Sequence, residues 1–326
     1  MSKKVIIKAR GAPDVMQISE ESISKPGEGL VKIKHELIGV NFIDTYHRSG
    51  LYPINMEYFT PGMEAIGYVT EIGSGVEGFK EGDRVCYGNG PIGSYCSERI
   101  MPHSTLFKVP KYIKNEDLAG SVLRFLTVWY LVEKLYCLSS KDIVLFHAAA
   151  GGVGLVFCQW AKSLGATVIG TVSSEKKAKL ALDHGCSFII NYRQNNFLDE
   201  VMKITNGEGV SVVYDGVGKS TFHDSLKSLK RKGLMVSFGN ASGPAPDLDV
   251  SSLGPLGSLF VTRPTLLDYT NDRNSLKEAF SRIFSLIRNK DIVSDVVQSY
   301  PLEDCVQSHT DLENRLTHGS TVLTVP

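Results

Sequence analysis

The sequence lacks an excess of charge of either sign, because 35 basic and 35 acidic residues cancel over its 326 positions. A strongly basic balance would favour nucleic acid or an anionic membrane as a partner, and this chain gives no such electrostatic reason. Catalysis or the binding of a small ligand is therefore the better default. The length exceeds that of one ordinary domain, so two domains or one large α/β unit are expected.

Paired cysteines and long apolar runs are also missing. The six cysteines are scattered and form no CxxC pair, which indicates neither a disulfide framework nor a zinc finger and fits a reducing cytoplasm. Residues 1–15 contain too short an apolar stretch for a signal peptide, and no window approaches ~18 uninterrupted apolar residues. We therefore expect a soluble protein that stays in the cytoplasm and does not enter a membrane.

The pattern of apolar and turn-forming residues changes near residue 124. Before it, short β-rich pieces alternate with glycine and proline turns, which is typical of an all-β, barrel-like unit. After it, short apolar runs alternate with helical stretches, which predicts a doubly wound α/β sheet of six parallel strands. The six runs are DIVLFH (142–147), ATVIGTV (166–172), SFIINY (187–192), SVVYDGV (211–217), LMVSFG (234–239) and SLFVTR (258–263).

The chain beyond Pro264 is too small to form a core of its own. It contains one expected helix over 275–289 and two short strands, the last of which closes the sequence. We therefore expect this tail to pack against the N-terminal unit.

A glycine-rich stretch follows the first of the six strands. The segment HAAAGGVGLVFCQWAK (147–162) places Gly151, Gly152, Val153 and Gly154 between a strand and a helix. Glycines at such a turn let the backbone approach a pyrophosphate, and the helix N-terminus faces the anion. Glycines in strand-to-helix turns also occur for packing alone, but the position in the first of six strand–helix units favours a dinucleotide.

The end of the second strand indicates which dinucleotide. An NAD-selective site places an acid there for the ribose hydroxyls, about 20 residues past the glycines. Here the position holds Val172, followed by Ser173, Ser174 and Lys177. Lysines on a helix are usually solvated, yet that does not explain the missing acid, so NADPH is favoured.

Five blocks of the sequence are, in order, NFIDTYHRSGLYP (41–53), PGMEAIGYVTEIGSGV (61–76), AAAGGVGLVFCQWAK (148–162), GLMVSFGNASG (233–243) and SLFVTRP (258–264). They resemble the zinc-free quinone oxidoreductases related to zeta-crystallin, in the medium-chain dehydrogenase/reductase superfamily. The resemblance covers nearly the whole chain and implies a GroES-like β-barrel catalytic domain (1–123 and 264–326) with a Rossmann domain (124–263). Lys141 departs from the family's usual small, uncharged polar or acidic residue ahead of the glycine turn.

The residues for zinc are absent from the places where the superfamily's alcohol dehydrogenases hold them. The GHE motif reads Gly62-Met63-Glu64, the first pocket loop has no cysteine, and the region of the structural-zinc lobe has one. Methionine is a poor zinc ligand beside imidazole or thiolate. Cys86 and Cys96 are interpreted as packed small hydrophobes.

Without a Lewis acid, an acceptor that is already electrophilic suits the site best. A quinone can take hydride directly from a dihydronicotinamide while the protein supplies orientation. The alternatives are an enal, enone or enoyl-thioester reductase on the same scaffold and, since some relatives are lens crystallins or RNA binders, a non-enzymatic role. The neutral net charge of the chain argues against strong binding of RNA.

The resemblance also implies site residues and an assembly. Asn41, Asp44, Tyr46 and Tyr52 are placed around the substrate and nicotinamide, with the tyrosines as pocket lining in preference to proton donors. Relatives pair the strand 258–263 across a two-fold axis, which implies a homodimer. The predicted cofactor contacts are Asn41, Thr127, Gly151, Gly152, Val153, Gly154, Ser173, Lys177, Tyr192, Phe238, Gly239, Asn240, Arg263 and Arg315.

Overall fold

The computed structural model describes residues 1–294 and 296–325. The chain divides into two compact units: the first unit comprises residues 1–126 and 270–326, and the second unit comprises residues 127–269. Helix α2 (Val122–Trp129) crosses the boundary and continues as a π-helical segment over Tyr130–Leu135. No helix in the described ranges is long and apolar enough to cross a bilayer.

The second unit is built on a six-stranded parallel sheet, as the sequence predicted. Its strand order is β10-β9-β8-β11-β12-β13, and every neighbouring pair is parallel. The strands are β8 (Ile143–Phe146), β9 (Thr167–Val172), β10 (Phe188–Asn191), β11 (Val210–Asp215), β12 (Leu229–Ser237) and β13 (Phe260–Thr262). The α-helices between and after them are α3 (Gly152–Ser163), α4 (Glu175–Asp183), α5 (Phe197–Ile204), α6 (Phe222–Lys227) and α7 (Leu266–Tyr269).

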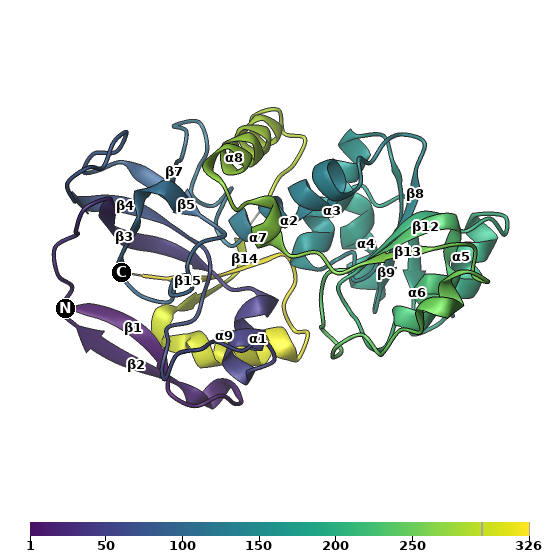
Figure 1. Ribbon diagram of the computed structural model, residues 1–326, viewed down its shortest axis with the longest axis horizontal. Helices are drawn as coiled ribbons and strands as arrows, with labels where there is room; N and C mark the ends of the chain where they lie inside the picture. Colours follow the sequence, from purple (N-terminus) through teal and green to yellow (C-terminus); the bar gives the residue numbers. More distant parts are fainter. Residues whose placement is uncertain (295, 326) are drawn as a thin grey trace. The chain divides into compact units, whose positions relative to one another are not determined.

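The interior strands of this sheet are largely apolar because helices cover both faces. All six residues of β11 are buried, and Leu145 in β8 and Ile169 in β9 are inaccessible to solvent. The teal and green ribbon in Figure 1 shows the helices packed around the strands. This is the Rossmann-like arrangement that the alternation of strands and helices predicts.

The first unit is mainly β-structure, in agreement with the predicted GroES-like barrel. A seven-stranded sheet centres on β3, which pairs antiparallel with β4, β6 and β15, and a separate hairpin joins β1 to β2. The strands are β1 (Ser2–Ile7), β2 (Met16–Glu21), β3 (Leu30–Gly39), β4 (Ala65–Ile72), β5 (Arg84–Tyr87), β6 (Glu98–Pro102), β7 (Phe107–Lys108), β14 (Val296–Pro301) and β15 (Ser320–Thr324). Its α-helices are α1 (Phe42–Ser49), α8 (Arg273–Arg288) and α9 (Cys305–Glu313).

The C-terminal tail packs on the N-terminal strands, as expected, because β15 pairs with β3 through Val322 opposite Gly39. The predicted helix over 275–289 is α8. The prediction of a single helix beyond Pro264 was wrong, since α7 and α9 also form. The buried face of α9 includes Ser308 and His309, so polar residues interrupt the apolar pattern by which helices are detected.

Candidate active site

The first strand of the parallel sheet leads into a turn that opens α3. Gly151 is the N-cap of the helix, and Gly152 is its first residue. A Cβ atom on Gly154 would lie 2.5 Å from the carbonyl oxygen of Ala149 and 2.6 Å from that of Ala148, so a side chain would force the helix away from the turn. Within the described structure, no side chain caps the first turn of α3 and no acidic residue lies in it. The helix N-terminus is therefore suited to a diphosphate.

Five residues gather at the carboxyl ends of β9 and β10. Val172 ends β9 and is 2% exposed, so its side chain belongs to the core. Ser173 follows it, and Ser174 caps α4 by accepting a hydrogen bond from the backbone of Lys177 at 3.4 Å. The backbone N–H of Tyr192 donates to the carbonyl oxygen of Val172 at 3.1 Å. A buried valine thus ends β9, and a lysine lies in the first turn of the next helix.

Arg263 ties the end of β13 to the end of β12. It donates from Nη1 to the carbonyl oxygens of Ser237, at 2.8 Å, and Gly239, at 3.2 Å. Between these acceptors, Phe238 packs its ring 5.8 Å from that of Phe146 at the end of β8. These contacts fix the backbone that follows β12.

Most of the predicted cofactor residues lie at the carboxyl edge of the parallel sheet, meaning the ends of its strands, the loops directly after them and the first turns of the helices that follow. The strand order reverses between β8 and β11, and sheets of this type bind ligands outside their carboxyl ends at such a point. Thr127 lies in α2, and Asn41 and Arg315 belong to the first unit. The residues brought to the edge are Gly151, Gly152, Val153, Gly154, Ser173, Lys177, Tyr192, Phe238, Gly239, Asn240 and Arg263.

Helix α1 and the turn after it hold the four residues predicted to surround the substrate. Asn41 is the N-cap of the helix, and its backbone N–H donates to Oδ2 of Asp44 at 2.9 Å. Gly50 ends the helix with φ at 87°, and Tyr52 returns a backbone hydrogen bond to the carbonyl oxygen of Tyr46 at 3.1 Å. The Tyr46 and Tyr52 rings lie 5.0 Å apart. The structure therefore brings the four residues together.

Behind the start of α1 lies Glu64, which is inaccessible to solvent. Its Oε1 accepts a hydrogen bond from Nδ2 of Asn41 at 2.6 Å, and its Oε2 accepts the backbone N–H of Leu123 at 2.9 Å. A Cβ atom on Gly39 would lie 2.1 Å from Oε1, so the carboxylate packs directly on the β3 backbone. Arg124, 6% exposed, supplies the buried positive charge beside it. The Asn41 amide is thus held by a buried carboxylate within a cluster of charged groups.

Burial controls the protonation of this cluster. It raises the pKa of Asp44 to about 7, against the opposing effect of hydrogen bonds from Asn41 and Tyr95, while the charge of Glu64 raises it further. Burial likewise raises the pKa of Glu64, although Arg124 lowers it. Two buried carboxyl groups near one guanidinium disfavour full ionisation, so Asp44 is poised to titrate near neutral pH.

The residues at the positions where the superfamily's alcohol dehydrogenases bind zinc are buried or make other contacts. Met63 is 9% exposed, and both oxygens of Glu64 already accept hydrogen bonds. Cys86 and Cys96 are buried, as predicted. His47 is half-buried and packs edge-on against Tyr52, with ring centroids 6.3 Å apart. Across the part of the chain that the structure describes, no three His, Cys, Asp or Glu side chains form a group that could hold a metal ion.

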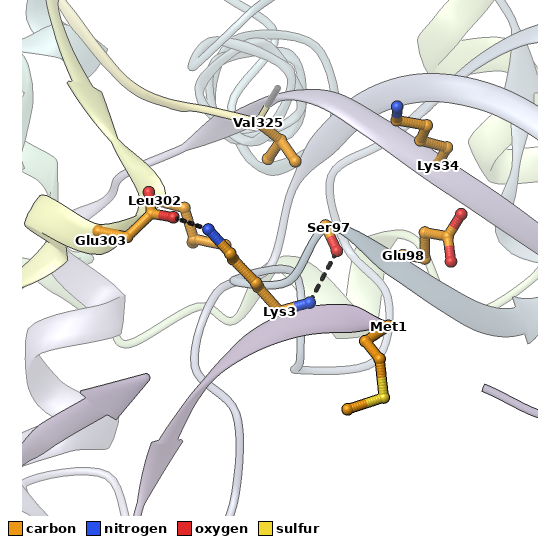
Figure 2. A pocket seen from close by; sticks show the side chains of 8 residues that line it. All are labelled: Met1, Lys3, Lys34, Ser97, Glu98, Leu302, Glu303 and Val325. Atoms are coloured by element: carbon orange, nitrogen blue, oxygen red, sulfur yellow. Dashed lines mark hydrogen bonds and ion pairs between the residues drawn. The ribbon is translucent and has the colours of Figure 1, made fainter. Parts of the chain in front are cut away.

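A separate cavity of about 270 Å³ lies in the first unit near the N-terminus (Figure 2). Lys3 crosses it to form an ion pair with Glu303 at 2.6 Å, and its backbone N–H donates to Oγ of Ser97 at 2.9 Å. Both charged side chains are about 40% exposed. The described residues that line this cavity include none predicted for the substrate or the cofactor.

Sequence patterns did not predict the buried polar groups behind α1, namely Glu64, Tyr95, Arg124 and His309. Arg124 offered a signal, because it stands in the apolar run SVLRFLTVW (121–129) and a buried charge requires a partner. The partners themselves are distant in sequence, so no local pattern identifies them.

Two family descriptions match the chain. Residues 27–111 match "Alcohol dehydrogenase GroES-like domain", and residues 152–285 match "Zinc-binding dehydrogenase". The chain is 45% identical to the "Quinone oxidoreductase" of Salmonella typhimurium over 325 residues, covering 99% of each protein. It is also 41% identical to the "2-haloacrylate reductase" of a Burkholderia species over 329 residues, again covering 99% of each.

A solved structure agrees with these matches. The chain superimposes on Escherichia coli quinone oxidoreductase complexed with NADPH with a TM-score of 0.97. The two are 44% identical, and the match covers 99% of this chain and 100% of the other.

Proposed function

The chain belongs to the quinone oxidoreductases of the medium-chain dehydrogenase/reductase superfamily, and we propose that it reduces quinones with NADPH. The observation that carries this proposal is the carboxyl edge of the parallel sheet. There a glycine turn opens a helix toward an anion, and the next strand ends in buried Val172 where an NAD site would hold an acid. The Escherichia coli relative with NADPH supports the same choice.

The residues present fit NADPH. Backbone groups at Gly151, Gly152 and Val153 would hold the diphosphate, since a helix N-terminus stabilises negative charge. Lys177 and Tyr192 flank the end of β9, where the 2′-phosphate would lie, and Ser173 adds a hydroxyl. We assign the remaining contacts to Thr127, Phe238, Gly239, Asn240, Arg263 and Arg315.

The substrate side of the reaction is assigned to α1 and the turn after it. When bound, NADPH supplies a hydride equivalent, and the overall reaction consumes one quinone, one NADPH and one proton to give hydroquinone and NADP⁺. Tyr46 and Tyr52 would line the quinone site through their rings, while Asn41 would orient the reactants. A quinone carbonyl needs orientation more than polarisation, which suits residues of this kind.

The assembly and location belong to the same proposal. Strand β13 lies at one edge of the sheet, and Phe260 on it is 62% exposed, so pairing of this strand with a second copy would cover an apolar edge and close a dimer. Six free cysteines fit a reducing cytoplasm. We retain 1–123 with 264–326 as the catalytic domain and 124–263 as the cofactor domain.

Steady-state NADPH oxidation with a substrate panel tests the function. We expect turnover with benzoquinones and naphthoquinones to exceed turnover with enals, enoyl thioesters and 2-haloacrylates. The 2-haloacrylate arm is included because a reductase of that name is 41% identical to this chain. Faster reduction of any conjugated alkene than of every quinone would replace the proposed substrate class, and RNA retention at physiological salt without turnover would replace the enzyme.

A further inference from the structure

A chain of buried hydrogen bonds connects α9 to the start of α1 inside the first unit, and Figure 1 shows these two helices side by side. Its outer end is Arg48, 2% exposed, which donates from Nη2 to Oε1 of Glu313 at 2.7 Å. Nη1 of Arg48 lies 3.0 Å from Nδ1 of His309. Because arginine has only donors, Nδ1 of His309 must be the acceptor and carries no proton.

That contact fixes which group donates and which accepts along the whole series of hydrogen bonds. Burial and the charge of Arg48 lower the pKa of His309 to about 3, so the ring is neutral and its one proton is on Nε2. Nε2 lies 2.9 Å from the hydroxyl of Tyr95 and donates to it. The hydrogen of Tyr95 is then directed to Oδ2 of Asp44, 3.1 Å away.

Asp44 links this series of hydrogen bonds to Asn41. Its Oδ2 accepts both the Tyr95 hydroxyl and the backbone N–H of Asn41, the latter at 2.9 Å. The side chain of Asn41 in turn bonds to Glu64. The orientation of Asn41 therefore depends on an ionised Asp44 held by two donors.

We propose that Tyr95 and His309 are positioning residues for quinone reduction, which hold Asp44, and through it Asn41, in the orientation that meets the reactants. The inference rests on the proposed function, which places Asn41 beside the quinone and the nicotinamide. Tyr95 and His309 are themselves inaccessible to solvent, so they act through Asp44 and do not touch the substrate.

The titratable and charged groups that face these hydrogen bonds come from several helices and strands. Asp44 is faced by Tyr95 and the Asn41 backbone, and also by the charges of Glu64, before β4, and Arg124, in α2. Tyr95 additionally faces Cys305 at the start of α9. The pKa of Asp44, about 7, lies in the range of an ordinary pH profile.

The test is the pH dependence of kcat/KM for a quinone at saturating NADPH in Tyr95→Phe. The substitution keeps the ring, which packs against His309 with centroids 5.7 Å apart, and removes only the hydroxyl. Asp44 then loses a donor that favours its ionised form, so kcat/KM should fall about fivefold at pH 7 and about tenfold well below that pH. The acid limb of the profile should move up by about one pH unit.

Tyr87→Phe is the matched control. Tyr87 is also buried, and its hydroxyl lies 3.0 Å from Nε2 of His35 and accepts a hydrogen bond from Nη1 of Arg99 at 3.3 Å. In the described part of the chain, none of these three side chains forms a hydrogen bond with α1. It should lower the melting temperature by a similar amount and leave the pH profile unchanged. His309→Gln should stay close to the native profile, because an amide N–H can still donate to Tyr95, whereas His309→Leu should behave like Tyr95→Phe.

A native profile in Tyr95→Phe would overturn the inference, and so would an equal shift in Tyr87→Phe. Failure of the proposed function is a separate result, seen when the unmodified protein turns over no quinone. In that case the positioning role is tested without turnover, by following the ¹³C signal of the Asp44 carboxyl group against pH. Asp44→Asn assigns that signal. The titration midpoint must rise in Tyr95→Phe, and an unmoved midpoint would reject the positioning role.

Discussion

The side-chain amide of Asn41 donates to Oε1 of Glu64 across 2.6 Å, and both residues are buried. The first residue of the proposed quinone site is therefore supported by a carboxylate that also caps α2 through Leu123 and feels the charge of Arg124. The shape of the site thus depends on a buried carboxylate.

Replacement of Glu64 should therefore lower the stability of the fold, beyond any effect on the reaction. Glu64→Ala removes the stronger-acting of the two negative charges that act on the buried Arg124 guanidinium, the other being Asp44, and loss of a buried charge partner costs up to about 3–5 kcal/mol. Glu64→Gln keeps an acceptor for Asn41 and should cost less. Chemical denaturation followed by circular dichroism measures both, and equal stability of Glu64→Ala and the native chain would contradict the assignment.

Cofactor preference should depend on Lys177. Lys177→Ala removes a charged contact to the 2′-phosphate, which is worth about 1.5–3 kcal/mol, so the KM for NADPH should rise tenfold or more while that for NADH changes little. The control is Lys176→Ala, because Lys176 is exposed on the same helix while Lys177 is half-buried. Equal use of both cofactors by the native enzyme would refute the NADPH assignment.

The parallel sheet was predictable because each strand is a short β-branched run between helices, and Val172 could be read directly from its position after the glycine turn. The support of the site was not predictable in the same way. Glu64 and His309 contact α1 from opposite ends of the chain, and α9 buries polar side chains that apolar periodicity does not detect. Long-range hydrogen bonds of this kind leave no local pattern.

Activity should not require a metal ion. Met63 stands where the related alcohol dehydrogenases hold a histidine, and both oxygens of Glu64 are already engaged as acceptors. Turnover should survive prolonged dialysis against a chelator, and elemental analysis should find far less than one zinc per chain. Stoichiometric zinc together with loss of turnover on chelation would reverse this prediction.

The proposed dimer should depend on one edge of the sheet. Phe260→Glu on β13 places a charge on the strand that would pair, so light scattering should fall from about twice the chain mass of 35.7 kDa toward the monomer. Phe188→Glu is the matched control, since Phe188 is 45% exposed on β10 at the other edge. A native chain that scatters as a monomer at micromolar concentration would count against the dimer.

The last prediction concerns the tyrosines of the first pocket loop. The Tyr46 and Tyr52 rings lie 5.0 Å apart, and Tyr46 is 9% exposed, which suits apolar lining. General acid catalysis typically supplies ~10²–10⁴-fold, so a committed proton donor would show a loss of that size in kcat when its hydroxyl is removed.

Reduction of a quinone forms a stabilised phenolate that solvent can protonate afterwards. We therefore expect Tyr46→Phe and Tyr52→Phe each to lower kcat by less than about tenfold, below the range of a general acid, whereas Tyr46→Ala and Tyr52→Ala should mainly raise the quinone KM by removing the ring surface. Steady-state kinetics separates the two effects. A thousandfold loss of kcat in either Tyr→Phe variant, with quinone binding intact, would identify that tyrosine as the proton donor. It would also favour the reduction of a conjugated alkene, because that reaction must deliver a proton to carbon or oxygen within the catalytic cycle.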